Sequence, residues 1–234
     1  MKSIVLVLLI LGSCYAHYTE DCLTLCEDVN PLDEWENEGY APSLYMLKTL
    51  CPKTLEFLDC RTEEMQDCLG QSFGDMAIST NFSIASFSRV ILATNTLIRQ
   101  VCNENSSFHK DYVRNIDCYK AFSYVIRQFC SQDVSRIENL FLGTLKVYPE
   151  EDMNCKVKLF SGPYELACMS DMIGRACGPT AKRLHATATL MFKDIFLVDC
   201  PHINQNWKEE YLDFLVGNKR REFEEIYNAF FKRF

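Results

Sequence analysis

A short glycine-containing motif is the strongest candidate for nucleophilic chemistry in this chain. Residues 70–74 read GQSFG and match the G-x-S-x-G pattern, in which a strand leads into a sharp turn that exposes the serine. A hydrolase of this kind would use Ser72 as nucleophile and His185 or His202 as base. The residues before the motif are polar and helix-like, and strand-like alternation is scarce along the chain. A loop after a helix accounts for the glycines, and we expect no catalytic residues.

Cysteine and histidine are the other residue types that could carry chemistry, as metal ligands or as a reactive thiol. The chain has 13 cysteines and four histidines, and the histidines are His17, His109, His185 and His202. The cysteine spacing lacks the repeated C-x2-C of zinc sites, and the scattered histidines form no HExxH motif. We therefore predict no metal ligands and no cofactor, and interpret the histidines as surface or hydrogen-bonded interior residues.

The first sixteen residues have the features of a secretory signal peptide. Lys2 precedes an apolar run at 4–11, and small and polar residues then lead to Ala16. The run is well short of the ~20 residues that a membrane span needs, and no later segment is long and apolar enough to cross a bilayer. We expect cleavage after Ala16 and a secreted, extracellular protein without a transmembrane segment; the alternative is an uncleaved anchor.

Cleavage after Ala16 would change the cysteine count from odd to even. It removes Cys14 and leaves twelve cysteines, which in a secreted chain predicts up to six disulfides. Each bridge would stabilise the fold by about 2–4 kcal/mol, mainly by restricting the unfolded chain. Their spacing alone does not determine the pairing. The twelve are Cys22, Cys26, Cys51, Cys60, Cys68, Cys102, Cys118, Cys130, Cys155, Cys168, Cys177 and Cys200.

Three positions are candidates for attached sugars. Asn81 and Asn105 each begin an N-x-S sequon, and Asn105 lies in the more polar stretch. Ser161 belongs to the only Ser-Gly pair after residue 16 and follows an acidic run at 150–152, as at sites where a glycosaminoglycan begins. The same residues read equally well as a turn at Gly162-Pro163 before a helix. We expect N-glycosylation at Asn81 and Asn105 and treat Ser161 as a weaker glycosaminoglycan candidate.

The apolar residues recur mostly at helical spacing, which predicts an all-α fold stapled by disulfides. The pattern indicates helices at 81–101, 119–129, 134–141, 164–176 and 181–198. Ser79 or Thr80 is a suitable cap for the first of them. Gly178-Pro179 is expected to end the helix at 164–176, because glycine suits a C-terminal cap and proline prevents continuation.

The cysteine spacing suggests two similar halves in a domain spanning 17–203. Twenty-four residues separate Cys26 from Cys51, and the same number separates Cys130 from Cys155. The halves would span 17–102 and 118–200, with 103–117 as the joint between them. Coincidence in a cysteine-rich chain is the alternative, because the residues between the cysteines show little similarity.

The last segment, 204–234, carries no cysteine and is expected to form amphipathic helices. Trp207, Tyr211, Phe214 and Leu215 form one apolar stripe, and Phe223, Ile226, Tyr227, Phe230, Phe231 and Phe234 form another. We expect the second stripe to pack in the core, as aromatic stripes usually do. A partner or membrane-surface helix is the alternative, because lysines and arginines flank the apolar face.

The cysteine framework resembles the secreted cysteine-rich helical domains of nematodes. The resemblance covers 22–200 and rests on Cys22-x3-Cys26, Cys51-x8-Cys60-x7-Cys68 and Cys168-x8-Cys177-Gly178. The chondroitin proteoglycan type is one such domain, and a neighbouring nematode family of unknown function is similar. The resemblance implies an extracellular, non-enzymatic protein of the matrix or eggshell type. Unlike a proteoglycan core, this chain has no Ser-Gly-rich tract.

Composition limits the remaining functional classes. The chain is 48% hydrophobic, so it can bury a substantial core, and its net charge of -8 argues against a general nucleic-acid binder. We expect an extracellular binding protein or structural matrix component that is not an enzyme. The alternative is an extracellular carrier of a lipid or other apolar ligand. The expected partner is an extracellular protein, a glycan or an apolar ligand.

Overall fold

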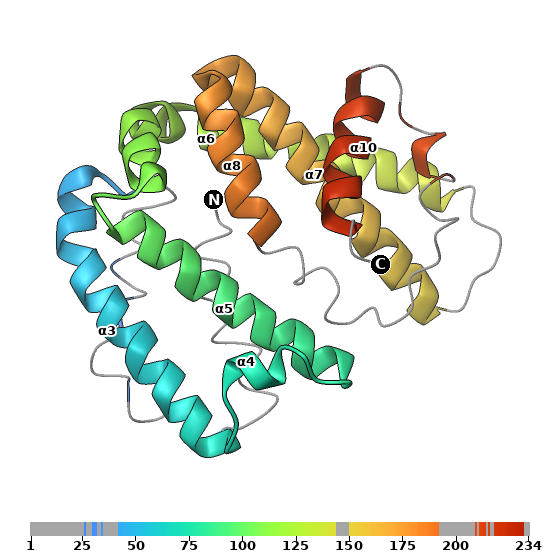
Figure 1. The fold of residues 1–234 in the computed structure, drawn as a ribbon. Coiled ribbons are helices and arrows are strands. Elements are labelled where there is room, and N and C mark those ends of the chain that lie inside the picture. The colour runs from blue at the N-terminus through green and yellow to red at the C-terminus, as the bar shows by residue number, and fades with distance from the viewer. Residues whose placement is uncertain are drawn as a thin grey trace. The chain divides into compact units, whose positions relative to one another are not determined.

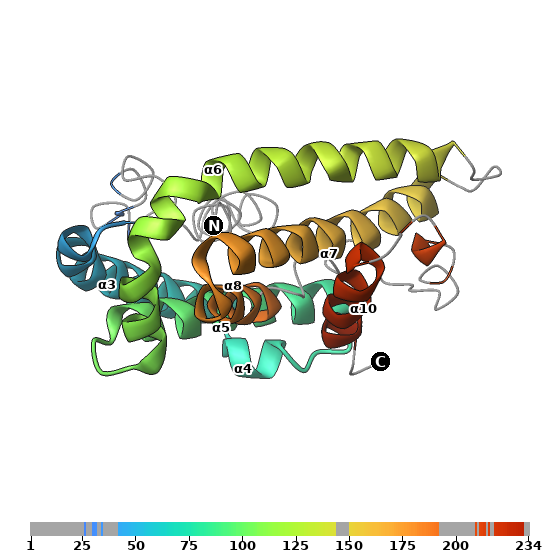
Figure 2. The same ribbon diagram turned by 90° about the horizontal axis from the view of Figure 1, so that it is seen from above.

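The fold is seen in a computed structural model, in which the chain divides into two compact units, Met1–Ala121 and Phe122–Phe234. The structure describes residues 42–143, 150–191, 211–213 and 218–231, together with Cys26, Asn30, Pro31, Glu34, Glu209 and Leu215. Every regular element among these residues is a helix (Figures 1 and 2), so the prediction of an all-α fold is confirmed.

Two long helices form the framework of the first unit. α3 (Leu44–Leu69) and α5 (Phe82–Cys102) run antiparallel and in contact (Figure 1), and the short α4 (Phe73–Met76) packs on α5. One disulfide, Cys51–Cys102, joins the first part of α3 to the end of α5, and Cys26–Cys60 ties an upstream residue to the central part of α3. The buried residues include Leu47, Leu50, Phe57, Leu97 and Ile98.

Side chains of the predicted type cap the helices of this unit. The Ser43 hydroxyl accepts a hydrogen bond from the Met46 amide at the start of α3. The cap of α5 is Asn81 and not Ser79 or Thr80, because the Asn81 Oδ1 accepts from the Ile84 amide at 3.2 Å. The Ser79 hydroxyl lies one step upstream and accepts from the Asn81 amide.

The two helices expected at 119–129 and 134–141 are one continuous helix, α6 (Ser107–Leu142). The intervening residues 130–133 include no glycine or proline that would end a helix. Cys130, Asp133 and Val134 are buried, so the continuous helix is also held by packing. α6 begins within the expected joint at 103–117, and the first residues of that joint form a turn after α5.

In the second unit, α7 (Glu150–Cys177) begins well before the expected start at Tyr164. The expected turn at Gly162-Pro163 is wrong, since Pro163 lies inside the helix. Its missing N–H leaves one helical carbonyl without the usual donor, which opposes helix formation locally. Leu159, Phe160 and Tyr164 on either side are almost completely buried. We infer that burial of these side chains outweighs the local cost of the proline.

α7 ends where the Gly178-Pro179 pair predicts. Gly178 has φ of +88°, and its N–H donates to the Gly174 carbonyl at 3.0 Å. Pro179 then begins α8 (Pro179–Met191), at a position where a helix tolerates proline. The prediction of a second helix from Ala181 is confirmed as far as Met191, and 192–198 lies outside the described residues.

The C-terminal helix α10 (Asn218–Phe231) packs on α7. Phe223, Ile226 and Tyr227 are buried, and the Phe223 ring lies 5.3 Å from that of Tyr211. The core interpretation of the aromatic stripe is confirmed for these side chains, and the membrane-surface alternative is wrong for them. Outside the described part lie Trp207, Phe214, Phe234 and the side chains of Phe230 and Phe231.

None of the described helices combines the length and the apolar character that a membrane span requires.

We expect Gly178→Ala to lower the free energy of unfolding by about 1–2 kcal/mol, because a Cβ is strained at positive φ. The Cβ itself would meet no atom within 4 Å, so the loss isolates backbone strain. Gly74→Ala is the control, since Gly74 lies in α4 without positive φ and its Cβ would make only an ordinary contact. Denaturant unfolding measures the free energy of unfolding of both variants. Equal losses would show that the positive φ of Gly178 is not the cause.

Candidate ligand-binding site

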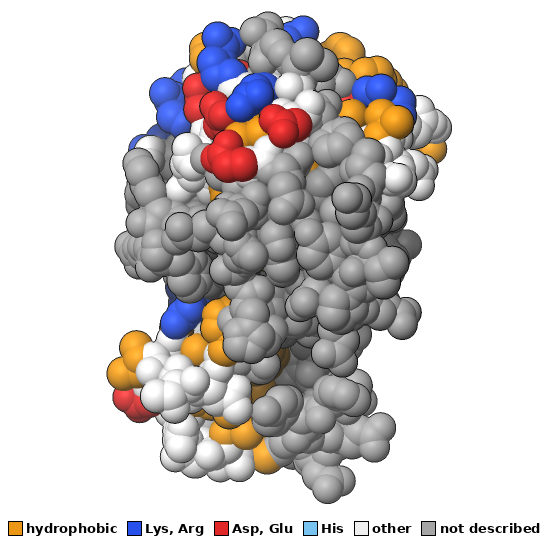
Figure 3. All heavy atoms as spheres, turned by 90° about the vertical axis from the view of Figure 1, so that its right-hand side faces the viewer, with side chains coloured by type: hydrophobic (Ala, Val, Ile, Leu, Met, Phe, Trp, Pro, Cys, Tyr) orange, Lys and Arg blue, Asp and Glu red, His pale blue; other side chains and the backbone are white. Residues whose placement is uncertain are grey.

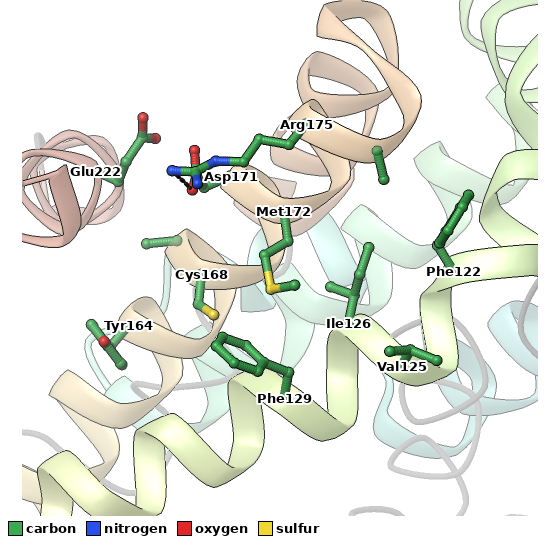
Figure 4. A pocket seen from close by; sticks show the side chains of 12 residues that line it. Phe122, Val125, Ile126, Phe129, Tyr164, Cys168, Asp171, Met172, Arg175 and Glu222 are labelled. Carbon is green, nitrogen blue, oxygen red and sulfur yellow. Dashed lines mark ion pairs between the residues drawn. The ribbon is translucent and has the colours of Figure 1, made fainter.

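A cavity of about 500 Å³ in the second unit is the candidate site. It lies between α6 and α7, is partly open to solvent and is lined mainly by apolar atoms (Figure 4). This volume falls within the ~300–1,000 Å³ of typical small-molecule sites. The lining residues are Phe122, Val125, Ile126, Phe129, Tyr164, Ala167, Cys168, Asp171, Met172, Arg175, Ala176 and Glu222.

The α6 wall is formed by residues one helical turn apart. Phe122, Val125, Ile126 and Phe129 have the spacing i, i+3, i+4 and i+7 and therefore share one face of the helix. Ile126 is buried, but Phe122, Val125 and Phe129 remain 45%, 60% and 50% exposed. Phe122, Ile126 and Phe129 belong to the apolar pattern that predicts a helix at 119–129. This pattern does not indicate that the face borders an open cavity, because periodicity reports a shared face and not what covers it.

The α7 wall places a disulfide and a thioether at the cavity. Cys168 lines the cavity and is bonded to Cys130 of α6. The Sδ atom of Met172 lies 3.7 Å from the Cys130 Sγ atom, and Met172 lies close to Phe129 in Figure 4. A methionine thioether adapts its shape readily, so this wall can fit ligands of somewhat different outline.

Three cross-links hold α6 and α7 together beside the cavity, and we name them the α6–α7 clamp. They are the Cys130–Cys168 disulfide, the hydrogen bond from the Ser131 hydroxyl to Glu165 and that from the Tyr164 hydroxyl to Asp133, both 2.6 Å long. All three lie within 130–133 of α6 and 164–168 of α7. The clamp therefore fixes the separation of the two cavity walls at one end.

The Asp133 carboxylate is a nearly buried part of this clamp. It accepts from Tyr164 and also from the Arg136 guanidinium at 2.9 Å, which compensates its charge. Burial, with the hydrogen bond to Asp133, raises the pKa of the Tyr164 hydroxyl far above its usual value. The Tyr164 hydroxyl therefore remains protonated and acts as a donor at any physiological pH.

The charged groups at the edge of the cavity are paired. The Arg175 guanidinium and the Asp171 carboxylate form an ion pair at 2.7 Å on α7, marked by a dashed line in Figure 4. Glu222 of α10 pairs with Lys182 of α8 at 2.8 Å. The four groups sum to zero formal charge.

The expected disulfides are found wherever the structure describes the cysteines. Cys26–Cys60, Cys51–Cys102 and Cys130–Cys168 are paired, and Cys68, Cys118 and Cys177 are also disulfide-bonded. Cys14, Cys22, Cys200 and the side chain of Cys155 lie outside the described residues.

Ser72, the candidate nucleophile, is a helix cap. It follows α3 and not a strand, and its hydroxyl accepts from the Asp75 amide at the start of α4 while lying 2.6 Å from the Asp75 carboxylate. The strand–turn–helix geometry of a nucleophile elbow is absent at this position. Of the proposed bases, His185 lies on α8 and His202 is outside the described residues.

A recess in the first unit carries acidic side chains beside the Cys26–Cys60 disulfide. It is lined by Glu56, Asp59, Glu63, Glu64 and Asp67. Asp59 pairs with Arg99, and Glu64 pairs with Arg61. Within the described part of the chain, no group of His, Cys, Asp and Glu side chains has the arrangement of a metal site.

The candidate sugar sites differ in their accessibility. Asn105 is exposed in the turn between α5 and α6, and Asn81 is exposed at the start of α5. Asn81 uses its Oδ1 as cap, which leaves the amide nitrogen where a glycan attaches outside that hydrogen bond. Ser161 lies inside α7 with its hydroxyl buried. A transferase would therefore reach the Ser161 hydroxyl only before the chain folds.

The described charges do not gather into a surface of one sign on the face shown in Figure 3. Lysines and arginines lie among aspartates and glutamates at one end of this face. Binding to a nucleic-acid backbone needs clustered positive charge, and the described residues on this face form no such cluster.

Comparisons with known proteins add no relative. No protein-family model, no curated protein and no solved structure matches this chain. The cavity and its clamp are the features of this chain that bear on function.

We expect Tyr164→Phe to lower the free energy of unfolding by about 1–3 kcal/mol, because it removes a donor from the buried Asp133 carboxylate. Tyr124→Phe is the matched control, since Tyr124 lies on α6 with its side chain exposed. The two losses are compared by denaturant unfolding. A loss no larger than that of the control would show that the hydrogen bond does not stabilise the clamp.

The buried His185 on α8 predicts a pH dependence of stability. Burial lowers its pKa from 6.5 to about 3, and its Nε2 has no hydrogen-bond partner among the described residues. Between these values the unfolded state binds more protons, so stability is full above pH 6.5 and decreases as the pH falls toward 3.

We expect His185→Leu to reduce this decrease by up to about 3 kcal/mol at pH ~4. Unfolding at a series of pH values measures the difference between the two proteins, which isolates His185 from the carboxylates that also titrate. If the stability of the wild-type protein and of His185→Leu changed with pH in the same way, the buried, neutral state of His185 would be contradicted.

Proposed function

We propose that this protein is an extracellular, non-enzymatic binding protein that holds an apolar ligand in the cavity between α6 and α7. The observation that carries the proposal is a cavity of about 500 Å³ with mainly apolar walls, joined beside it by a disulfide. Apolar cavities with few polar groups are typical of small-molecule sites.

The disulfides support the extracellular part of the proposal. Such bonds persist in oxidising environments and are rare in the cytosol. Six described cysteines form three pairs, of which Cys51–Cys102 and Cys130–Cys168 join two helices and Cys26–Cys60 joins an upstream residue to α3. The described helices include no membrane-spanning candidate. The leader expected at 1–16 and glycans at Asn81 and Asn105 fit the same compartment.

The α6–α7 clamp supports the binding part of the proposal. A cavity bordered by Phe122, Val125 and Phe129 leaves apolar surface in water, and covering that surface with a ligand is favourable by about 25 cal/mol per Å². Because the clamp fixes the walls, a ligand would pay little to order them. A preformed apolar cavity of this kind can therefore retain a small molecule.

A structural or matrix role, implied by the resemblance to nematode secreted domains, is the runner-up. A separate observation supports the organisation in two halves that the cysteine spacing suggests. The second cysteine of each half pairs with the fourth, as Cys26–Cys60 and Cys130–Cys168, with sequence separations of 34 and 38. A glycosaminoglycan on Ser161 would favour this role over ligand carriage.

The test is binding of the uncharged fluorescent probe Nile red to the full chain expressed in a secretory system. We expect one probe molecule per chain, with the affinity lowered about tenfold or more by Val125→Glu, because a bound probe would cover the new carboxylate and remove its hydration. Ile78→Glu is the control, since Ile78 is an exposed apolar residue of the first unit.

Either of two results would contradict the proposal. Nile red that does not bind the wild-type protein excludes an accessible apolar cavity. An equal loss of Nile red affinity in Val125→Glu and Ile78→Glu would show that the probe binds outside the cavity. Native mass spectrometry of the secreted protein adds a direct readout, because a retained ligand appears as additional mass that denaturation removes.

A further inference from the structure

We infer, on the basis of the proposed function, that the ligand of the α6–α7 cavity is an uncharged apolar molecule and not a fatty-acid-like anion. The cavity offers apolar contact on both walls, and each hydroxyl or charged side chain of its lining already has a partner.

The polar lining side chains are all engaged elsewhere. The Tyr164 hydroxyl donates to Asp133, and Asp133 is held by Arg136. Arg175 is paired with Asp171, and Glu222 is paired with Lys182. Cys168 is in a disulfide and Met172 offers only a weak acceptor. A ligand that buried a carboxylate here would therefore lose its hydration without gaining a free donor, which is costly.

The charges at the edge of the cavity also disfavour an anion. Two of the three charged lining residues, Asp171 and Glu222, are acidic, and the third, Arg175, already has a carboxylate partner. In Figure 4, Arg175 and Asp171 lie beside each other, and Glu222 projects from α10 on the same side. An anionic ligand that paired with Arg175 would take this partner from the Asp171 carboxylate. The ligand's negative charge would then lie near that of Asp171, and their repulsion would offset the attraction between ligand and Arg175.

An uncharged ligand meets none of these costs. A chain or ring system of low polarity would contact Phe129, Ile126 and Met172 and leave the ion pairs intact. Methionine adapts to varied outlines, and aromatic side chains provide broad contact area. We therefore assign an uncharged long-chain or ring-containing lipid as the ligand class, with any hydroxyl or ester group at the solvent side.

The experiment compares two ligands with chains of equal length, one with an uncharged hydroxyl head group and the other with a carboxylate. Hexadecanol and hexadecanoate are titrated against Nile red bound to the full wild-type chain at neutral pH, below the concentration at which either aggregates. We expect hexadecanol to displace the probe at a concentration at least about tenfold lower than hexadecanoate. Equal displacement by the two, or stronger displacement by the acid, would overturn the inference.

A variant tests the stated cause of this discrimination. Asp171→Asn removes the partner carboxylate of Arg175, and we expect the ratio between the two affinities to narrow toward one. Glu63→Gln is the control, because it removes the same charge from an exposed position of α3, and the ratio should not change. An unchanged ratio in Asp171→Asn would overturn the electrostatic argument.

The failure of this inference is distinguishable from that of the proposed function. Nile red binding that is lost in Val125→Glu but is displaced by neither ligand would refute a long-chain lipid and leave an apolar site standing. Occupation of the cavity by a second copy of the chain is a further outcome. It would appear as probe binding that weakens with rising protein concentration, with a dimer in light scattering, and it would overturn the inference.

Discussion

The α6–α7 clamp is the constraint that holds the two walls of the cavity together. Cys130–Cys168, Ser131–Glu165 and Asp133–Tyr164 join two helices along little more than one turn. The disulfide restricts the unfolded chain, and the hydrogen bond from Tyr164 satisfies a carboxylate that would be costly to bury alone. Because the clamp is covalent and polar, it does not need the apolar side chains next to it for closure, and these are left to line a cavity.

The aromatic core of α7 and α10 supports this arrangement from the other side. Phe160 stacks on Tyr211 with ring centroids 4.8 Å apart, and the Tyr227 ring lies 6.0 Å from Phe160. Burial raises the pKa of Tyr227 to about 12, so its ring stays uncharged in the core. With one side of α7 packed against this cluster, its other side is free to face α6 and the cavity.

The part of the cavity that can be read from the sequence is limited to the residue types and their spacing. Helical periodicity correctly placed Phe122, Ile126 and Phe129 on one face of a helix. The even count of cysteines expected after cleavage at Ala16 indicated disulfides. Neither pattern indicates that Cys130 pairs with Cys168, because pairing depends on which helices pack together. Nothing in the sequence marked Val125, Met172 or Arg175 as cavity residues, because each is an ordinary helix residue until the opposite wall is known.

The amino-acid sequence alone predicts the all-α class, the helix end at Gly178-Pro179 and the presence of disulfides, because these follow from local backbone preferences and composition. The extent of α6 and α7 follows instead from tertiary packing. This packing kept Pro163 inside a helix, because Phe160 and Tyr164 are buried on either side of it. It also decided which apolar face was buried and which bordered a cavity. That choice depends on contacts between residues far apart in the chain, which local spacing does not encode.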